Sequence, residues 1–119
     1  MKFILLIAEP QVEFDRRNDP EKSPAYWAAW KTYSDALKTA GVMVSSLGLP
    51  SPKTATTIRV REGKRQIHDG PYAETKEFLG GFAILEVPDL AAATEWAARC
   101  PAASCGAVEV RPAPMECGC

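Results

Sequence analysis

The sequence predicts one α+β domain in which an antiparallel sheet carries two helices on one of its faces. Apolar runs and two stretches of helical periodicity follow one another in the order strand, helix, strand, hairpin, strand, helix, strand. A chain of 119 residues can bury one hydrophobic core but not two. Its 46% hydrophobic and 24% charged residues are typical of an ordinary globular domain.

The first predicted strand covers residues 2–8, which are apolar on both alternating faces and end at Glu9-Pro10. A strand of this kind is covered on both sides, as in the middle of a sheet. The apolar run is too short for a secretory signal and has no cleavage site, so we expect a cytoplasmic protein. Residues 11–22 are polar and charged, and we expect a loop there.

The first predicted helix begins at Ser23-Pro24, with serine as N-cap and proline in the first turn, and ends at Gly41. One apolar stripe runs along it, formed by Tyr26, Trp30, Tyr33 and Leu37. Core packing against the sheet is the simpler interpretation of this stripe. The alternative is that Tyr26 or Trp27 lines a ligand pocket at the start of the helix.

The middle of the chain predicts a strand over 42–47 and a hairpin whose strands are 54–61 and 65–68. Alternation in the hairpin places Ile58, Val60 and Ile67 on one face. The opposite face then carries Arg59, Arg61, Gln66 and His68. His68 therefore shares a face with Arg59.

The last third of the chain predicts a strand over 82–87, a helix over 90–99 that Asp89 caps, and a strand over 107–111. The complete order is a ferredoxin-like βαββαβ plan with an added β-hairpin. Two helices cover only one face of the sheet, yet the strands 2–8 and 82–87 are apolar on both faces. A homodimer whose sheets face each other would bury the second face, and we expect one.

The polar stretch from His68 to Gly81 connects the hairpin to the next strand. His68 and Asp69 are candidate catalytic residues, because an imidazole accepts a proton at neutral pH and a carboxylate can orient it. Neighbouring strand residues point to opposite faces, so a direct pair requires a bend at Gly70-Pro71. The alternative is that Asp69 bonds the turn backbone while His68 is a strand residue in contact with water.

Residues 69–77, Asp-Gly-Pro-Tyr-Ala-Glu-Thr-Lys-Glu, closely resemble the signature of the DGPF group of YCII-related proteins, with Tyr72 where phenylalanine is usual. Agreement extends to 40–42, 49–50, 60–64 and 109–112, so the resemblance covers essentially the whole chain. It implies a dimeric α+β barrel of ferredoxin-like protomers. It also implies two functional expectations, acid–base chemistry by a His/Asp pair and, for some members, an association with sigma factors.

The candidate ligand-binding residues are Arg59, Tyr72, Glu74 and Lys76 near the predicted barrel mouth, together with Tyr26 at the start of the first helix. We expect them to bind a small polar molecule, with cofactor-free proton transfer of the isomerase or lyase type if the protein is an enzyme. The rival expectation is a non-catalytic binding or accessory module, tied to sigma-factor regulation through the family resemblance only.

Other function classes find no support in the sequence. A net charge of −1 gives no electrostatic reason to expect nucleic acid or a membrane as partner. There is no nucleophile elbow and no phosphate-binding glycine loop, and we expect no cofactor. The chain divides into a domain over 1–112 and a cysteine-containing tail over 113–119. The spacing of Cys100, Cys105, Cys117 and Cys119 is not that of a zinc ribbon, so we expect no metal. The expected cytoplasmic setting favours reduced thiols.

Overall fold

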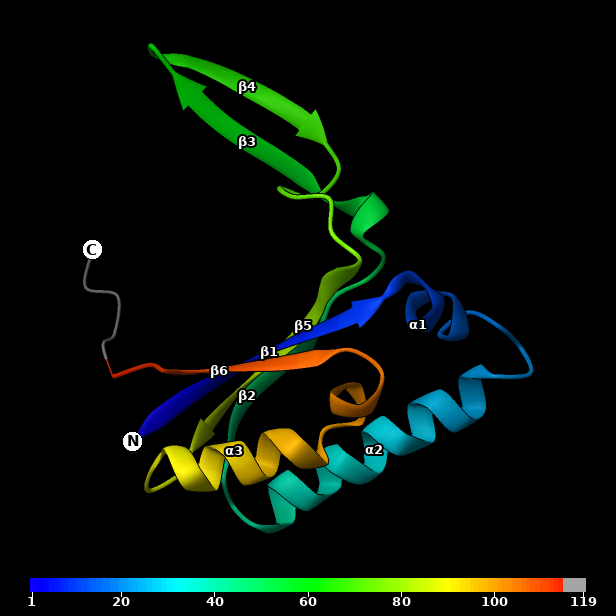
Figure 1. The fold of residues 1–119 in the computed structure, drawn as a ribbon, viewed down its shortest axis with the longest axis vertical. Coiled ribbons are helices and arrows are strands. Elements are labelled where there is room, and N and C mark those ends of the chain that lie inside the picture. Colours follow the sequence, from blue (N-terminus) through cyan, green and yellow to red (C-terminus); the bar gives the residue numbers. More distant parts are fainter. Residues whose placement is uncertain (115–119) are drawn as a thin grey trace.

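The computed structural model describes residues 1–114 and shows two layers with a projecting arm (Figure 1). The main sheet consists of β1 (Lys2–Pro10), β2 (Met43–Gly48), β5 (Glu77–Glu86) and β6 (Ala107–Pro112). Its order is β2-β5-β1-β6, and every neighbouring pair is antiparallel. The strands β3 (Thr56–Arg61) and β4 (Lys64–Asp69) form a separate hairpin, which we call the arm. The predicted α+β fold with a βαββαβ order and an inserted hairpin is confirmed.

The two long helices, α2 (Ser23–Thr39) and α3 (Leu90–Arg99), lie on the same side of the sheet (Figure 1). As predicted, Pro24 lies in the first turn of α2, and the chain leaves the helix through Gly41, which has a φ of 73°. The Asp89 carboxylate caps α3 by accepting from the Ala92 N–H. Ser23 lies inside the first turn instead of capping it. No helix within residues 1–114 is both long and apolar enough to cross a membrane.

The prediction of a loop over 11–22 is wrong for its first half. There the short helix α1 (Gln11–Arg16) follows β1 directly. Phe14 and Glu13 are buried on the inner side of α1. A six-residue helix with one aromatic anchor contains too little apolar periodicity to be distinguished from a polar loop.

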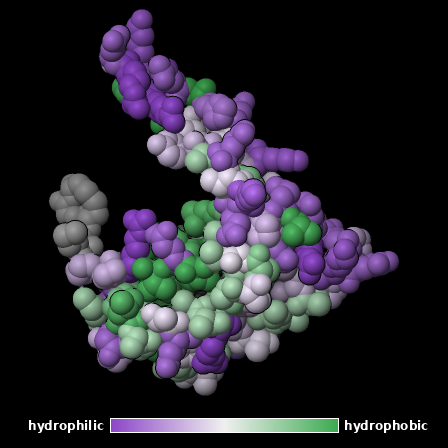
Figure 2. All heavy atoms as spheres, viewed as in Figure 1, coloured by the Kyte–Doolittle hydropathy of each residue, from purple (hydrophilic) through white to green (hydrophobic). Residues whose placement is uncertain are grey.

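The core lies between the sheet and the two long helices. Its β1 members alternate with half-buried residues on the other face, and α2 contributes two of the four predicted stripe residues. The largest contributors are Phe3, Leu5, Ile7, Tyr33, Leu37 and Leu85. The opposite face of the sheet is also apolar at its centre, where Ile4 and Leu6 of β1 pair with Ile84 and Phe82 of β5. Hydrophobic side chains gather over the sheet in Figure 2.

β5 begins five residues before the predicted start at Phe82, because β1 continues to Pro10 and pairs with Glu77. Between these ends Gly80 forms a β-bulge, since Ile7 pairs with Gly81 and Ala8 with Leu79. The connection between arm and sheet shortens to residues 70–76, which form bends and no helical turn.

Candidate functional site

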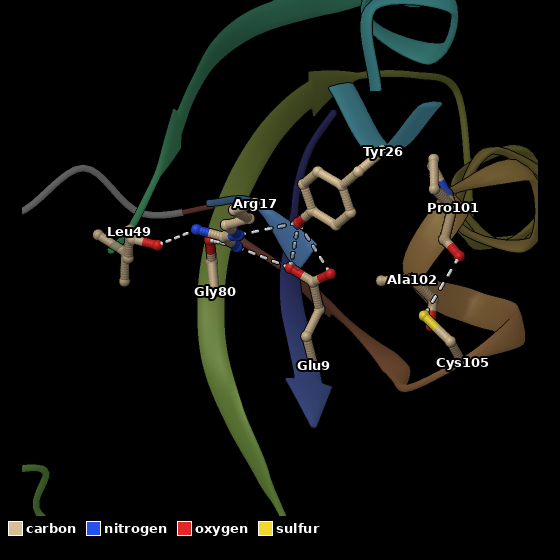
Figure 3. A network of polar contacts seen from close by, with 8 residues as sticks. All are labelled: Glu9, Arg17, Tyr26, Leu49, Gly80, Pro101, Ala102 and Cys105. Atoms are coloured by element: carbon tan, nitrogen blue, oxygen red, sulfur yellow. Dashed lines mark hydrogen bonds and ion pairs between the residues drawn. The ribbon is translucent and has the colours of Figure 1, made fainter. Parts of the chain in front are cut away.

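A buried carboxylate at the end of β1 is the centre of a polar network (Figure 3). Glu9 is only 1% exposed, and its carboxylate lies 2.7 Å from the Nη2 atom of Arg17. The Tyr26 hydroxyl lies 2.9 Å from both carboxylate oxygens and donates to them. Arg17 Nε in turn donates to the Tyr26 hydroxyl at 2.9 Å. The three groups therefore form a closed triangle of charge-assisted hydrogen bonds.

Arg17 also links the segments around this triangle. Its guanidinium donates to the backbone oxygen of Leu49, after β2, and to that of Gly80 at 3.2 Å. Three aromatic rings surround it, with centroids 4.5 Å away in Phe14, 5.6 Å in Tyr26 and 5.7 Å in Trp27. One side chain thus connects β5, the end of β2 and the first turn of α2.

The absence of a side chain at Gly80, in the bulge of β5, allows Arg17 and Glu9 to lie close to the β5 backbone. A Cβ atom at Gly80 would lie 2.9 Å from Arg17 Nη2 and 2.9 Å from Glu9 Oε1, with the Phe14 ring at 3.2 Å. These distances are shorter than van der Waals contact. Glycine is therefore the residue that fits the backbone against the network.

Burial, followed by the hydrogen bond to Glu9, raises the pKa of Tyr26 to about 12. The phenol consequently keeps its proton throughout the physiological range. It can donate that proton in a hydrogen bond either to Glu9 or to an oxygen atom of a molecule beside it.

A pocket of about 180 Å³ lies between α2 and the sheet, and the network forms one end of its wall. Aromatic rings of α2 and aliphatic side chains provide much of the remaining wall, and Ser34 and Ser46 add hydroxyl groups. The lining includes Arg17, Tyr26, Trp27, Trp30 and Tyr33. An apolar cavity of about 150 Å³ accepts a benzene molecule, so this pocket has room for a single substituted ring.

A second hollow, of about 440 Å³, opens where Tyr26 and Glu9 meet the start of α1 and the segment after α3. Among the described residues, Glu9, Glu13 and Cys105 hold potential metal ligands within 4.8 Å of one another here. Glu9 is already bound to Arg17 and Tyr26, and burial together with Glu13 raises the pKa of the Cys105 thiol. Metal binding needs the thiolate, so the cluster fits a packed polar contact better than a metal centre. Cys117 and Cys119 lie outside the described residues.

The arm brings three of the sequence-predicted residues together. In the hairpin register Thr57 pairs with His68 and Arg59 with Gln66, which confirms that Arg59 and His68 share a face. The Arg59 guanidinium lies 5.2 Å from the centroid of the Tyr72 ring. Together they line an open hollow of about 280 Å³. All three side chains are exposed to solvent.

The other sequence-predicted residues are separated from this hollow. Asp69 pairs with Thr56 at the end of the arm, and lines a different open hollow together with Glu74. Lys76 is exposed and lines neither hollow. Tyr26 lies in the body, on α2 (Figures 1 and 3).

Sequence reasoning missed Glu9 and Arg17. A signal for Glu9 was present, because it continues the alternation of Phe3, Leu5 and Ile7 and therefore lies on the core face of β1. A carboxylate in such a position requires a cationic or hydrogen-bonding partner. Arg17 had no comparable signal, since it follows a helix that the sequence did not reveal.

Comparisons with known proteins identify a family and a fold. The family model described as YCII-related domain matches residues 1–113. Among solved structures, 5-chloro-2-hydroxyhydroquinone dehydrochlorinase (TftG) from Burkholderia phenoliruptrix AC1100, in complex with 2,5-dihydroxybenzoquinone, is similar with a TM-score of 0.56. The two chains are 15% identical over 98% of this chain and 96% of the other, which supports the same fold. A search of the curated proteins finds no match.

Proposed function

The chain belongs to the YCII-related domain family, and from this membership we propose that it binds a small cyclic molecule with oxygen substituents. We assign that molecule to the pocket between α2 and the sheet. The observation that carries this proposal is the pocket itself, in which aromatic walls end at a guanidinium and a protonated phenol. Flat aromatic walls favour a ring, and the polar end favours oxygen atoms that accept hydrogen bonds.

The structural neighbour provides a matching example of chemistry, since TftG was solved with a hydroxylated benzoquinone. We extend only the class of ligand to this chain, because at 15% identity the likeness concerns the fold. If a reaction takes place, we propose cofactor-free proton transfer of the isomerase or lyase type. In that reaction the Tyr26 hydroxyl donates to a substrate oxygen while Glu9 and Arg17 hold it in position.

We expect Tyr26→Phe to weaken binding of 2,5-dihydroxybenzoquinone about 10-fold, the value of one hydrogen bond of about 1.4 kcal/mol. Titration calorimetry measures this, with 4-hydroxybenzoate as a second probe that does not react with thiols. Tyr72→Phe makes the same chemical change in the exposed connection that follows the arm and should leave the affinity unchanged. Equal affinities in all three proteins would contradict the assignment to this pocket.

A second candidate function concerns the arm, and the stacking of Arg59 on Tyr72 beside His68 favours it. In this second proposal His68 and Asp69 are the acid–base pair and the protein is a member of the DGPF group. His68 is the only histidine of the chain, so its imidazole resonances report on this site alone. A His68 pKa that shifts on addition of candidate metabolites, with turnover lost in Asp69→Asn, would support the arm. An accessory module would instead show an unchanged histidine and a co-purifying protein such as a sigma factor.

We propose a cytoplasmic homodimer in which the open faces of two sheets meet. The half-buried apolar residues Ile4, Leu6, Phe82 and Ile84 on that face support it, since the helices leave them uncovered. Light scattering at micromolar concentration should give twice the mass of 12.9 kDa. Ile84→Lys should convert the protein to a folded monomer, whereas Thr94→Lys on the exposed side of α3 should not. A monomeric wild type would contradict this assembly.

A further inference from the structure

The arm forms no strand pairing with the main sheet of its own chain. Its two strands have six residues each and pair only with each other, and it projects away from the body (Figure 1). A lone two-stranded hairpin is marginally stable in water at best, and hairpins become stable when a face packs on something else. The arm therefore needs a surface that covers it.

One face of the arm is apolar and open. Ile58 pairs directly with Ile67, and Val60 follows on the same face. Their exposed fractions are 60%, 65% and 56%. Three neighbouring β-branched side chains remain more than half exposed, and together they form an apolar surface suited to contact with another protein.

The net charge of the arm is opposite in sign to the net charge of the rest of the chain. From Thr56 to Asp69 the arm has four cationic residues and two carboxylates, Glu62 and Asp69, which gives +2. Because the whole chain carries −1, the remaining residues carry −3. A basic arm and an acidic body attract each other between two copies of the same chain.

We propose that the arm clasps a second copy of this chain, with Ile58, Val60 and Ile67 against the partner's body and the basic tip beside its carboxylates. This inference rests on the homodimer proposed above and adds a contact that the sheet faces do not provide. Nucleic acid is the other occupant suited to a basic β-ribbon, but the acidic body would repel phosphates. The charge distribution therefore favours self-association.

Sedimentation equilibrium over a dilution series tests the clasp. The double variant Ile58→Ser/Ile67→Ser should weaken dimerisation at least 10-fold, because it removes the apolar face while leaving the sheet intact. Leu90 on α3 is exposed to a similar degree, and Leu90→Ser should change the dissociation constant less than 2-fold. Charge reversal of Arg61 and Arg65 to glutamate should also weaken the dimer, and most strongly at low salt.

Isotope-filtered nuclear Overhauser spectra of a mixed dimer give a second readout that does not depend on variants. The clasp predicts contacts from the Ile58 and Ile67 methyl groups of the labelled copy to protons of the unlabelled copy. A dimer without such contacts, and with unchanged affinity in the arm variants, would overturn the clasp while leaving the sheet-face dimer in place. A wild-type monomer at all concentrations would overturn both. Binding of short duplex DNA that is lost on charge reversal, with an unchanged dimer constant, would assign the arm to nucleic acid instead.

Discussion

Arg17→Met should destabilise the fold by about 3–5 kcal/mol, the usual cost of leaving one partner of a buried ion pair without the other. The Glu9 carboxylate is 1% exposed and would retain only the Tyr26 hydroxyl as a partner. Methionine fills a similar volume, so the loss reports mainly on charge and hydrogen bonds. Urea denaturation measures the change in the free energy of unfolding.

The preceding residue provides a matched control. Arg16 is about half exposed, and its Nε lies 3.6 Å from Glu13. Arg16→Met should therefore cost less than about 1 kcal/mol, as is typical of exposed ion pairs. Adding Glu9→Gln to Arg17→Met should restore part of the lost stability, because it removes the unpaired charge. Equal losses of unfolding free energy in the two arginine variants would contradict the predicted contribution of the buried network to stability.

Gly80→Ala should destabilise the fold by about 2 kcal/mol, within the range expected for overpacking. The added methyl group would lie 2.9 Å from Arg17 Nη2 and Glu9 Oε1, so the ion pair must shift to admit it. Because Arg17 also closes one end of the pocket, the variant should bind ring ligands more weakly. Thermal unfolding and titration calorimetry measure the two effects.

Gly48→Ala is the control for this substitution. A Cβ at Gly48 meets nothing within 4 Å. Alanine there should be neutral or slightly stabilising, since glycine loses more conformational freedom on folding than alanine does. If Gly80→Ala were as well tolerated, the close packing of β5 against Arg17 would not be a real constraint.

The arrangement of the sheet and of the two long helices could be predicted from the sequence because both depend on local patterns. The stripe along α2 and the capping by Asp89 are readable within a few residues. The face shared by Arg59 and His68 follows from strict alternation in a hairpin, and the register of the arm confirms it. Such features need no knowledge of distant segments.

The sequence offered only the part of the candidate pocket at the start of α2, because residues far apart in the chain form the rest. Arg17 reaches Glu9, Tyr26, Leu49 and Gly80 only once α1 has turned the chain back over β1. The sequence pointed instead to the polar stretch beside His68, where ionisable groups are dense. In the fold that stretch lies at the base of an exposed arm, whereas Tyr26 and Trp27, the alternative that the sequence offered, lie in the wall of the pocket.

The most direct test of the pocket is a titration with 2,5-dihydroxybenzoquinone followed through the three indole N–H resonances of the protein. Trp27 and Trp30 line the pocket, whereas Trp96 lies on α3, and each indole gives one signal in a proton–nitrogen correlation spectrum. We predict saturable shifts of the Trp27 and Trp30 signals, reversed by dialysis, with Trp96 and the His68 imidazole unchanged. Shifts confined to His68 and its neighbours on the arm, with all three indoles unmoved, would contradict the proposed site.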